Sequence, residues 1–328
     1  MKFRTEIEAK KSDLTLKPWL PIVMAGSCFS ENIARIMRGC LWNAVNVSGT
    51  LYNPLSIASN LELFLISDDG ERILENSLFE KDGVWKSWLF DSGMAADSPE
   101  QCLEEFNQRK IKIREALKIG ETIIVTFGTN VFYAYKKLDL PVSNCHKLPS
   151  SEFEQKELTI ERVKEIWFKL LDHIHLIYPE LQIIFTISPV RYLKYGFEGN
   201  SLSKAILRLG IDEICRHFDF CHYFPAFEIL NDDLRDYRFY SSDLVHPSEE
   251  AVEYIWEKFK ETYLNEEGLE LVKKGEIIVK GLDHKLKPSA LRMIPEAIQK
   301  KEIQRLQALK SDYQSLLNRY PHLFSINS

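Results

Sequence analysis

One stretch near the amino terminus constrains the fold more than any other. Residues 21–25 are apolar and long enough for one buried strand, and residues 30–37 carry apolar side chains at helical spacing. Between them lies a turn that contains Gly26 and Ser27. Open α/β sheets bind ligands at the carboxyl ends of their strands, and the first N–H groups of a following helix can stabilise an anion. The pattern therefore predicts either a functional turn or an ordinary turn in which Ser27 caps the helix.

Strands and helices alternate through most of the chain. Further strands are predicted at residues 42–47, 121–127, 181–187 and 218–224, and helices at residues 55–66, 98–118, 159–178, 202–217 and 248–263. This alternation is typical of a mostly parallel sheet that is covered by helices on both faces. Residues 68–97 resemble an irregular insertion with a hairpin arm at 85–90, and residues 131–148 form a mixed excursion. We therefore expect an α/β protein with a three-layer, flavodoxin-like α/β/α fold.

The character of the sequence changes toward the carboxyl end. Residues 295–320 predict a charged helix, and the apolar run at residues 275–279 is too short to anchor a second core. We expect residues 1–264 to form a catalytic domain and residues 265–328 to form a mostly helical C-terminal extension. The long helix of this extension is a candidate surface for packing on the main domain or for forming a homo-oligomer, and no chemistry is predicted there.

Composition argues against several classes of partner. The chain has 328 residues, 27% of them charged, and a net charge of −6 without a long basic tract, so neither nucleic acid nor an anionic membrane is an expected partner. Its six cysteines are scattered, which favours a reducing compartment over a disulfide scaffold. The first residues lack the apolar run of a signal peptide, and no apolar stretch has the length of a membrane span. We therefore expect a cytoplasmic protein.

A second motif could supply the general base that a nucleophile in this turn needs. Asp243 precedes His246 by three residues, and Pro247 suits the first position of the next helix. The carboxylate can fold back to accept a hydrogen bond from Nδ1–H, which leaves Nε2 free to take a proton from a nucleophile. Taken alone, such an Asp is as readily a helix cap and such a His a surface residue. Together with the turn at Ser27, the motif indicates nucleophilic catalysis.

The order of these motifs is similar to that of a known hydrolase superfamily. A strand, a Gly-Ser turn and a helix open the fold, Gly128-x-Asn130 follows a middle strand, and Asp243-x-x-His246-Pro247 precedes the last core helix. This order resembles the SGNH, or GDSL-like, hydrolases. Within them, Gly26-Ser27-Cys28-Phe29-Ser30 resembles the motif of the GSCFA family. The resemblance covers about residues 15–263 and extends to four further segments, at residues 52–57, 144–147, 188–191 and 236–240.

The resemblance implies a serine esterase that cleaves an acyl ester, with O-acetyl groups on carbohydrate as the substrate that the superfamily suggests. It makes Ser27 the nucleophile, His246 the general base and Asp243 the residue that orients His246. It also implies three oxyanion donors, which are the backbone N–H groups of Ser27 and Gly49 and the side-chain amide of Asn130. No cofactor is implied. Compared with the superfamily, Ala25-Gly26 replaces the usual Gly-Asp before the serine, and Val131 stands where an Asp is common.

Several residues near these motifs have an alternative role. Cys28 is intrinsically a better nucleophile than Ser27, but the resemblance aligns Cys28 with an apolar, inward-facing position, so Ser27 is preferred. Tyr52, His146 and Arg191 are candidates for binding substrate. His146 equally suits a surface loop, and Arg191 equally suits a structural ion pair.

Other functions remain open from the sequence. The Cys-His pairs at residues 145–146 and 221–222 match no common zinc-ligand spacing, so we expect no metal site. An acyltransferase would use the same three catalytic residues, because its first half-reaction is identical to that of an esterase. A non-catalytic binding protein on the same scaffold would use the charged C-terminal helix as its working surface.

Overall fold

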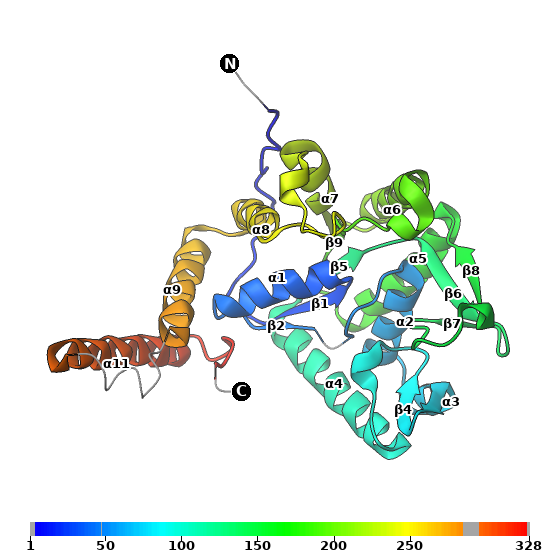
Figure 1. Ribbon diagram of the computed structural model, residues 1–328, viewed down its shortest axis with the longest axis horizontal. Helices are drawn as coiled ribbons and strands as arrows, with labels where there is room; N and C mark the ends of the chain where they lie inside the picture. Colours follow the sequence, from blue (N-terminus) through cyan, green and yellow to red (C-terminus); the bar gives the residue numbers. More distant parts are fainter. Residues whose placement is uncertain (1–3, 47, 285–294, 327–328) are drawn as a thin grey trace. The chain divides into compact units, whose positions relative to one another are not determined.

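A parallel sheet forms the centre of the computed structural model, which describes residues 4–46, 48–284 and 295–326. The five strands are β1 (Ile22–Gly26), β2 (Ala44–Val45), β5 (Thr122–Phe127), β9 (Gln182–Ile187) and β10 (Cys221–Phe224). They lie in the order β10-β9-β5-β1-β2, of which β9, β5, β1 and β2 are labelled in Figure 1, and the pairs β1–β5, β5–β9 and β9–β10 are parallel. The chain moves from β1 to β2 and then returns to β5 on the other side of β1. The strand order therefore reverses between β1 and β5, and open α/β sheets bind ligands at such a point.

One face of the sheet is covered by a layer of helices. These are α2 (Pro54–Leu65), α4 (Pro99–Gly120), α5 (Ile160–Ile177) and α6 (Gly196–His217), with α4 beside α2, α2 beside α5 and α5 beside α6. Val23, Val125 and Phe185 of the strands share a buried cluster with this layer. Two of the helices begin where the sequence predicts, because Asn53 and Ser98 accept hydrogen bonds from the N–H groups of Ser56 and Gln101.

The alternate side chains of the same strands face the opposite side of the sheet. Met24, Ile124 and Ile184 belong to this second set, and all three are buried. β1 leads directly into α1 (Cys28–Gly39), which lies on the other side of β1 from α4 (Figure 1). A further helix, α8 (Glu249–Tyr263), follows the Asp243–His246 motif. The expected α/β fold with a mostly parallel sheet and flanking helices is confirmed.

The connecting segments are more regular than expected. Asp82 and Gly83 form the turn of a hairpin between β3 (Leu78–Lys81) and β4 (Val84–Ser87), so the hairpin arm expected at residues 85–90 is present but shorter. Helix α3 (Gly70–Ser77) precedes it where only irregular structure was expected. The excursion after β5 is a small antiparallel sheet. Its strands are β6 (Val131–Tyr135), β7 (Leu140–Val142) and β8 (Phe153–Glu157). Short helical turns complete the described elements: η1 (Ser92–Met94), η2 (Ser150–Glu152), η3 (Leu193–Tyr195), α7 (Ala226–Glu228), η4 (Ile229–Leu234) and η5 (Tyr237–Phe239).

By internal contacts the chain divides into two compact units. The first comprises the chain up to Glu8, Ile22–Ile33 and Val45–Glu257, and the second comprises Ala9–Pro21, Ala34–Ala44 and the chain from Lys258 onward. The boundary that we predicted after residue 264 therefore differs from the division by contacts, because two early segments belong to the second unit. All candidate site residues lie in the first unit.

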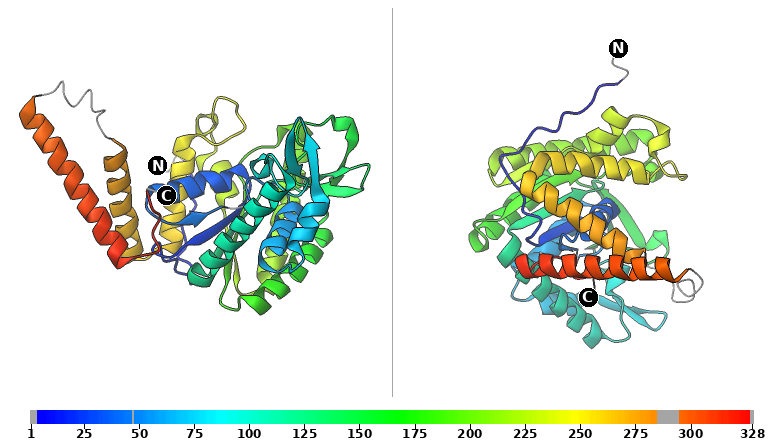
Figure 2. Two further views of the ribbon diagram at one scale, coloured as in Figure 1. Left: turned by 90° about the horizontal axis from the view of Figure 1, so that it is seen from below. Right: turned by 90° about the vertical axis from the view of Figure 1, so that its left-hand side faces the viewer.

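The second unit has an apolar core of its own. Helices α9 (Glu266–Asp283) and α11 (Glu296–Arg319) lie side by side (Figure 2). Its buried cluster contains Leu41, Leu271, Ile278, Leu282, Tyr313, Leu316 and Leu323. The expectation that residues 275–279 are too short to anchor a core was wrong, because these residues form the middle of α9, whose apolar positions are spread along the whole helix. No described helix is long and apolar enough to cross a membrane.

We predict that Gly26→Ala destabilises the protein far more than Gly39→Ala. Gly26 has a φ of 131°, and a Cβ there would collide with the carbonyl oxygen of Thr126, whereas a Cβ at Gly39 would meet nothing within 4 Å. Backbone strain and overpacking together should lower the free energy of unfolding by about 3 kcal/mol or more for Gly26→Ala. Gly39→Ala should change it by less than about 1 kcal/mol. Urea denaturation of the full chain measures both values, and equal losses would contradict this account of the turn.

Candidate active site

Backbone hydrogen bonds fix the turn after β1 on two sides. Gly26 pairs with Thr126 of β5, and the N–H of Ser27 donates to the carbonyl oxygen of Thr126 at 3.1 Å. On the other side of the strand, the N–H of Leu51 donates to the carbonyl oxygen of Gly26 at 2.8 Å. The carbonyl oxygen of Ser27 accepts the N–H of Ser30 at 2.8 Å, which closes the first turn of α1. Strand, turn and helix therefore follow one another without a free loop.

Ser27 is held in a position that does not suit a nucleophile. Its residue exposure is 1%, and its Oγ is inaccessible to solvent and has no hydrogen-bond partner among the described residues. Its N–H is already bonded to Thr126. Neither the hydroxyl nor the N–H of Ser27 therefore has the geometry that the resemblance implies for a nucleophile and an oxyanion donor.

Cys28 is the first residue of α1 and remains partly exposed. Burial raises the pKa of its thiol, while hydrogen bonds from the backbone N–H groups of Phe29 and Cys28 and the nearby charge of Lys204 lower it. The first N–H groups of an α-helix have no partner within the helix, so they can serve an anion at this point. Burial outweighs the other effects, and the thiol is therefore protonated in the resting protein.

Lys204 of α6 is buried at the same edge of the sheet. Its residue exposure is 3%, and Nζ donates to the carbonyl oxygens of Gly128 and Ser188, each at 2.7 Å. These carbonyls follow β5 and β9, so the lysine joins the ends of two neighbouring strands. Desolvation lowers the pKa of Lys204 to about 7. Sequence reasoning missed this residue, although it occupies a position on the apolar face of α6, in line with Leu207 and Ile211.

Two tyrosines, Tyr52 and Tyr192, lie at this edge of the sheet. The hydroxyl of Tyr192 is buried and has no hydrogen-bond partner among the described residues, and burial raises its pKa well above the usual value. A Cβ at Gly128 would collide with this hydroxyl, so the glycine makes room for it. The ring of Tyr52 meets that of Tyr192 edge-on, with centroids 5.8 Å apart, and Tyr52 is 38% exposed. The carbonyl oxygen of Tyr52 accepts the N–H groups of Gly128 and Thr129. Tyr52 thus lies at the predicted edge of the sheet.

The two other expected oxyanion donors are also positioned by the loops at this edge. Asn130 is buried, with its N–H donating to Ser203 Oγ at 2.9 Å and its Nδ2 donating to the carbonyl oxygen of Leu158 at 3.0 Å. One hydrogen of the Asn130 amide remains for another acceptor. Gly49 has a φ of 69°, and a Cβ there would collide with the carboxylate of Asp91.

The expected contact between Asp243 and His246 is present. Oδ2 of Asp243 lies 2.6 Å from Nδ1 of His246, and both side chains are about half exposed, at 48% and 47%. Oδ1 of Asp243 accepts the backbone N–H groups of His246 at 3.0 Å and Val245 at 2.9 Å, aided by a left-handed φ of 58° at Leu244. The backbone N–H groups of His246 and Val245, followed by the imidazole, lower the pKa of Asp243 to about 2. The carboxylate is therefore ionised and fixes the orientation of the ring.

The loop that carries His246 is tied to the end of β9. The N–H of Arg191 donates to the carbonyl oxygen of Val245 at 3.1 Å. The Arg191 guanidinium lies over the ring of Tyr240, 3.9 Å from its centroid, and 5.3 Å from that of Tyr237. Arg191 therefore packs against aromatic rings of the loop, and its expected role in binding a substrate anion stays a prediction. These contacts bring His246 to the same sheet edge as Tyr192, which directly follows Arg191.

His146 is not at the mouth of this site. It is 5% exposed, its Nε2 hydrogen-bonds the carbonyl oxygen of Ser87 at 2.8 Å, and its ring packs edge-on against Phe79 and Trp88. Burial lowers the pKa of its imidazole. Its burial and its hydrogen bond serve the packing around β3 and β4, and they do not support a role in binding substrate. Within the described residues, no three His, Cys, Asp or Glu side chains gather as metal ligands would.

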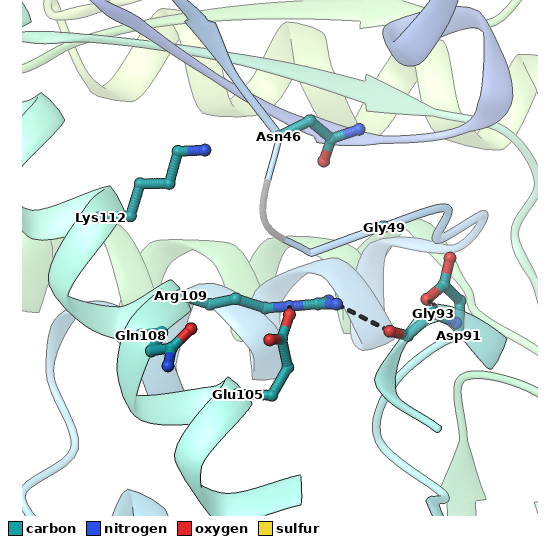
Figure 3. Close-up of a pocket in the computed structure, with 8 residues that line it drawn as sticks. All are labelled: Asn46, Gly49, Asp91, Gly93, Glu105, Gln108, Arg109 and Lys112. Atoms are coloured by element: carbon teal, nitrogen blue, oxygen red, sulfur yellow. Dashed lines mark hydrogen bonds and ion pairs between the residues drawn. The ribbon is translucent and has the colours of Figure 1, made fainter. Parts of the chain in front are cut away.

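A polar pocket of about 370 Å³ opens next to Gly49 (Figure 3). It is lined by Asn46, Gly49, Asp91 and Gly93 from loops and by Glu105, Gln108, Arg109 and Lys112 from α4. Arg109 donates to the carbonyl oxygen of Gly93 at 2.8 Å and pairs with Glu105 at 2.7 Å, and Asp91 accepts the N–H of Thr50 at 2.9 Å. Thr50 forms a bridge with Gly26, so the pocket adjoins the turn after β1.

We predict that Lys204 gives the protein a distinctive pH dependence of stability. Its pKa falls from 10.5 to about 7 on folding, so between these values the unfolded chain binds more protons at this position, and stability rises with pH. Lys204→Met should remove up to about 1.4 kcal/mol per pH unit from the slope of the unfolding free energy in this window. Urea denaturation from pH 7 to pH 10 measures the slope. Lys118→Met, at an exposed position of α4, should keep the wild-type slope, and equal slopes for both variants would contradict the buried charge.

Comparison with protein families identifies the family of the chain. The model of the GSCFA family matches residues 21–259, which include the turn after β1, Asn130, Lys204 and the Asp243–His246 motif. No curated protein is found to match the chain. Because the family model covers well over half of the sequence, the chain belongs to the GSCFA family.

Proposed function

We propose that this protein is an acyl-ester hydrolase that works through a covalent acyl-enzyme, as SGNH-type hydrolases do. The observation that carries the proposal is the 2.6 Å contact between Asp243 Oδ2 and His246 Nδ1. It lies on a loop tied to the carboxyl edge of the sheet, where the turn after β1 presents a helix N-terminus. An oriented imidazole at the sheet edge that also carries such a turn supports nucleophilic acyl transfer.

The roles of the side chains follow from their contacts. Asp243 accepts Nδ1–H, which leaves Nε2 of His246 as the atom that takes the proton from the nucleophile. Nε2 has no hydrogen-bond partner among the described residues. The first N–H groups of α1, which have no partner within the helix, and the second amide hydrogen of Asn130 can stabilise the oxyanion of the tetrahedral intermediate. His246 then returns the proton to the leaving alcohol.

The pocket beside Gly49 bears on the class of alcohol. Its lining is polar and contains both acidic and basic side chains, and the amide of Gln108 and the amine of Lys112 are exposed donors within it. Such a lining suits a leaving group rich in hydroxyls better than an aliphatic alcohol. This supports an O-acyl carbohydrate, the substrate class that the SGNH resemblance suggests.

We predict that ester hydrolysis depends on both members of the Asp243–His246 pair. His246→Ala should lower kcat/KM for p-nitrophenyl acetate by ~10²–10⁴, since general-base help is lost. Asp243→Asn should lower it by about 10² or more, because the imidazole loses its orienting acceptor. Steady-state release of p-nitrophenolate by the full chain measures these values.

Asp236→Asn is the matched control for this prediction. Asp236 lies in the same region and likewise accepts a backbone N–H, that of Arg238 at 2.9 Å, but it does not contact His246. Its replacement should leave kcat/KM near the wild-type value. If Asp243→Asn and His246→Ala are as active as Asp236→Asn, or if the wild-type protein turns over neither this ester nor an acetylated sugar, the proposed function is wrong.

A further inference from the structure

The turn after β1 contains two nucleophilic side chains, and they differ in solvent exposure. Ser27 is 1% exposed with an inaccessible Oγ, whereas the neighbouring Cys28 is partly exposed. The cause is the hydrogen bond from Ser27 N–H to Thr126, which keeps Ser27 in the register of the sheet. Cys28 is the first residue that leaves the strand and enters the helix. Access therefore favours Cys28.

The surroundings of Cys28 are those of a reactive group. It lies at the N-terminus of α1, where the backbone N–H groups of Phe29 and Cys28 lower the pKa of the thiol. It interacts electrostatically with Lys204, Tyr52 and Tyr192. The Tyr192 hydroxyl there is buried and has no partner among the described residues. Lys204 Nζ in turn lies 5.1 Å from the centroid of the Tyr192 ring. A buried lysine, a phenol without a partner among the described residues and the N-terminus of a helix thus lie at the same sheet edge as this thiol, and such groups gather where charge develops during a reaction.

We propose that Cys28, rather than Ser27, is the nucleophile of this site, so that the acyl group is carried as a thioester. This inference rests on the acyl-ester chemistry proposed above and names the atom that performs it. It also moves the first oxyanion donor by one residue, from the N–H of Ser27, which is bonded to Thr126, to that of Cys28 at the start of α1. The change of nucleophile and the change of oxyanion donor have the same cause, which is the hydrogen bond from Ser27 N–H to Thr126.

The reaction balances with these groups alone. Nε2 of His246 takes the proton of Cys28 Sγ–H, and the sulfur attacks the carbonyl carbon of the ester. The tetrahedral oxyanion collapses as the carbon–oxygen bond to the alcohol breaks, and His246 gives its proton to the alcohol oxygen. A water molecule then attacks the thioester while His246 takes a proton from it. The carboxylic acid leaves, and the proton on His246 returns to the sulfur.

The test locates and identifies the acyl-enzyme bond. The full-length wild type, Cys28→Ala, Cys28→Ser and Ser27→Ala are mixed with p-nitrophenyl acetate, quenched in acid, and mapped by peptide mass spectrometry with and without neutral hydroxylamine, which cleaves thioesters much faster than oxygen esters. We expect the acetyl group on Cys28 of the wild type and of Ser27→Ala, and its loss with hydroxylamine. Ser27→Ala removes only a buried hydroxyl without a partner, so it should fold and remain active.

The three cysteine and serine variants separate the two proposals. Cys28→Ala should lose at least ~10² in kcat/KM, and any adduct on Cys28→Ser should resist hydroxylamine. An acetyl group on Ser27, together with an active Cys28→Ala and an inactive Ser27→Ala, would overturn the assignment of Cys28 and leave the esterase proposal intact. Absence of His246-dependent turnover in the wild type would instead remove the proposed function.

A second measurement needs no substrate. Cys145 is a matched control, because it is also partly exposed, burial also raises its thiol pKa, and a lysine, Lys194, also lowers it. Iodoacetamide labelling of the wild type should modify Cys28 faster than Cys145. His246→Ala should slow the labelling of Cys28 and leave that of Cys145 unchanged. Equal rates at both cysteines, or a Cys28 rate that is insensitive to His246, would overturn the proposal whether or not an ester is turned over.

Discussion

The backbone contact between the turn after β1 and strand β5 is the constraint on which the candidate site depends. Gly26 packs so closely on the backbone of Thr126 that no other residue fits, and Ser27 N–H continues the ladder one residue beyond the strand. The helix therefore starts at Cys28. Where the ladder stops decides which side chain remains in the sheet and which one leaves it. The proposal of Cys28 as the nucleophile therefore follows from backbone register.

The same edge of the sheet concentrates polar groups that are costly to bury. The ammonium group of Lys204 loses its hydration and recovers two hydrogen bonds from the carbonyls of Gly128 and Ser188. Tyr192 places a hydroxyl without a partner beside Gly128. Packing alone would favour apolar side chains at both positions. Their presence next to a thiol at the point where the strand order reverses is consistent with a site adapted to an anionic intermediate.

The fold and one half of the site could be predicted from the sequence because their signals are local. Alternating strands and helices predict the parallel sheet, and the spacing of Asp243 and His246 within one turn predicts their contact. The exposure of Ser27 and Cys28 could not be predicted, because it depends on a hydrogen bond to Thr126, which lies far along the chain. The position of Lys204 on an apolar helix face could have indicated a buried lysine. Its hydrogen-bond partners could not be predicted, because they come from two distant strand ends. The core of the second unit was missed because α9 spreads its apolar residues over the whole helix, so that no single run is long.

The most direct test of the account is the distance between Cys28 Sγ and His246 Nε2 in a crystal structure of the full chain. A thiol that passes its proton to this imidazole should lie within about 4 Å of it, with Asp243 retained on the other ring nitrogen. The account predicts that separation and a Ser27 hydroxyl that remains inside the core. An imidazole that faces Ser27, or that lies far from both side chains with its loop still tied to Arg191, would contradict it.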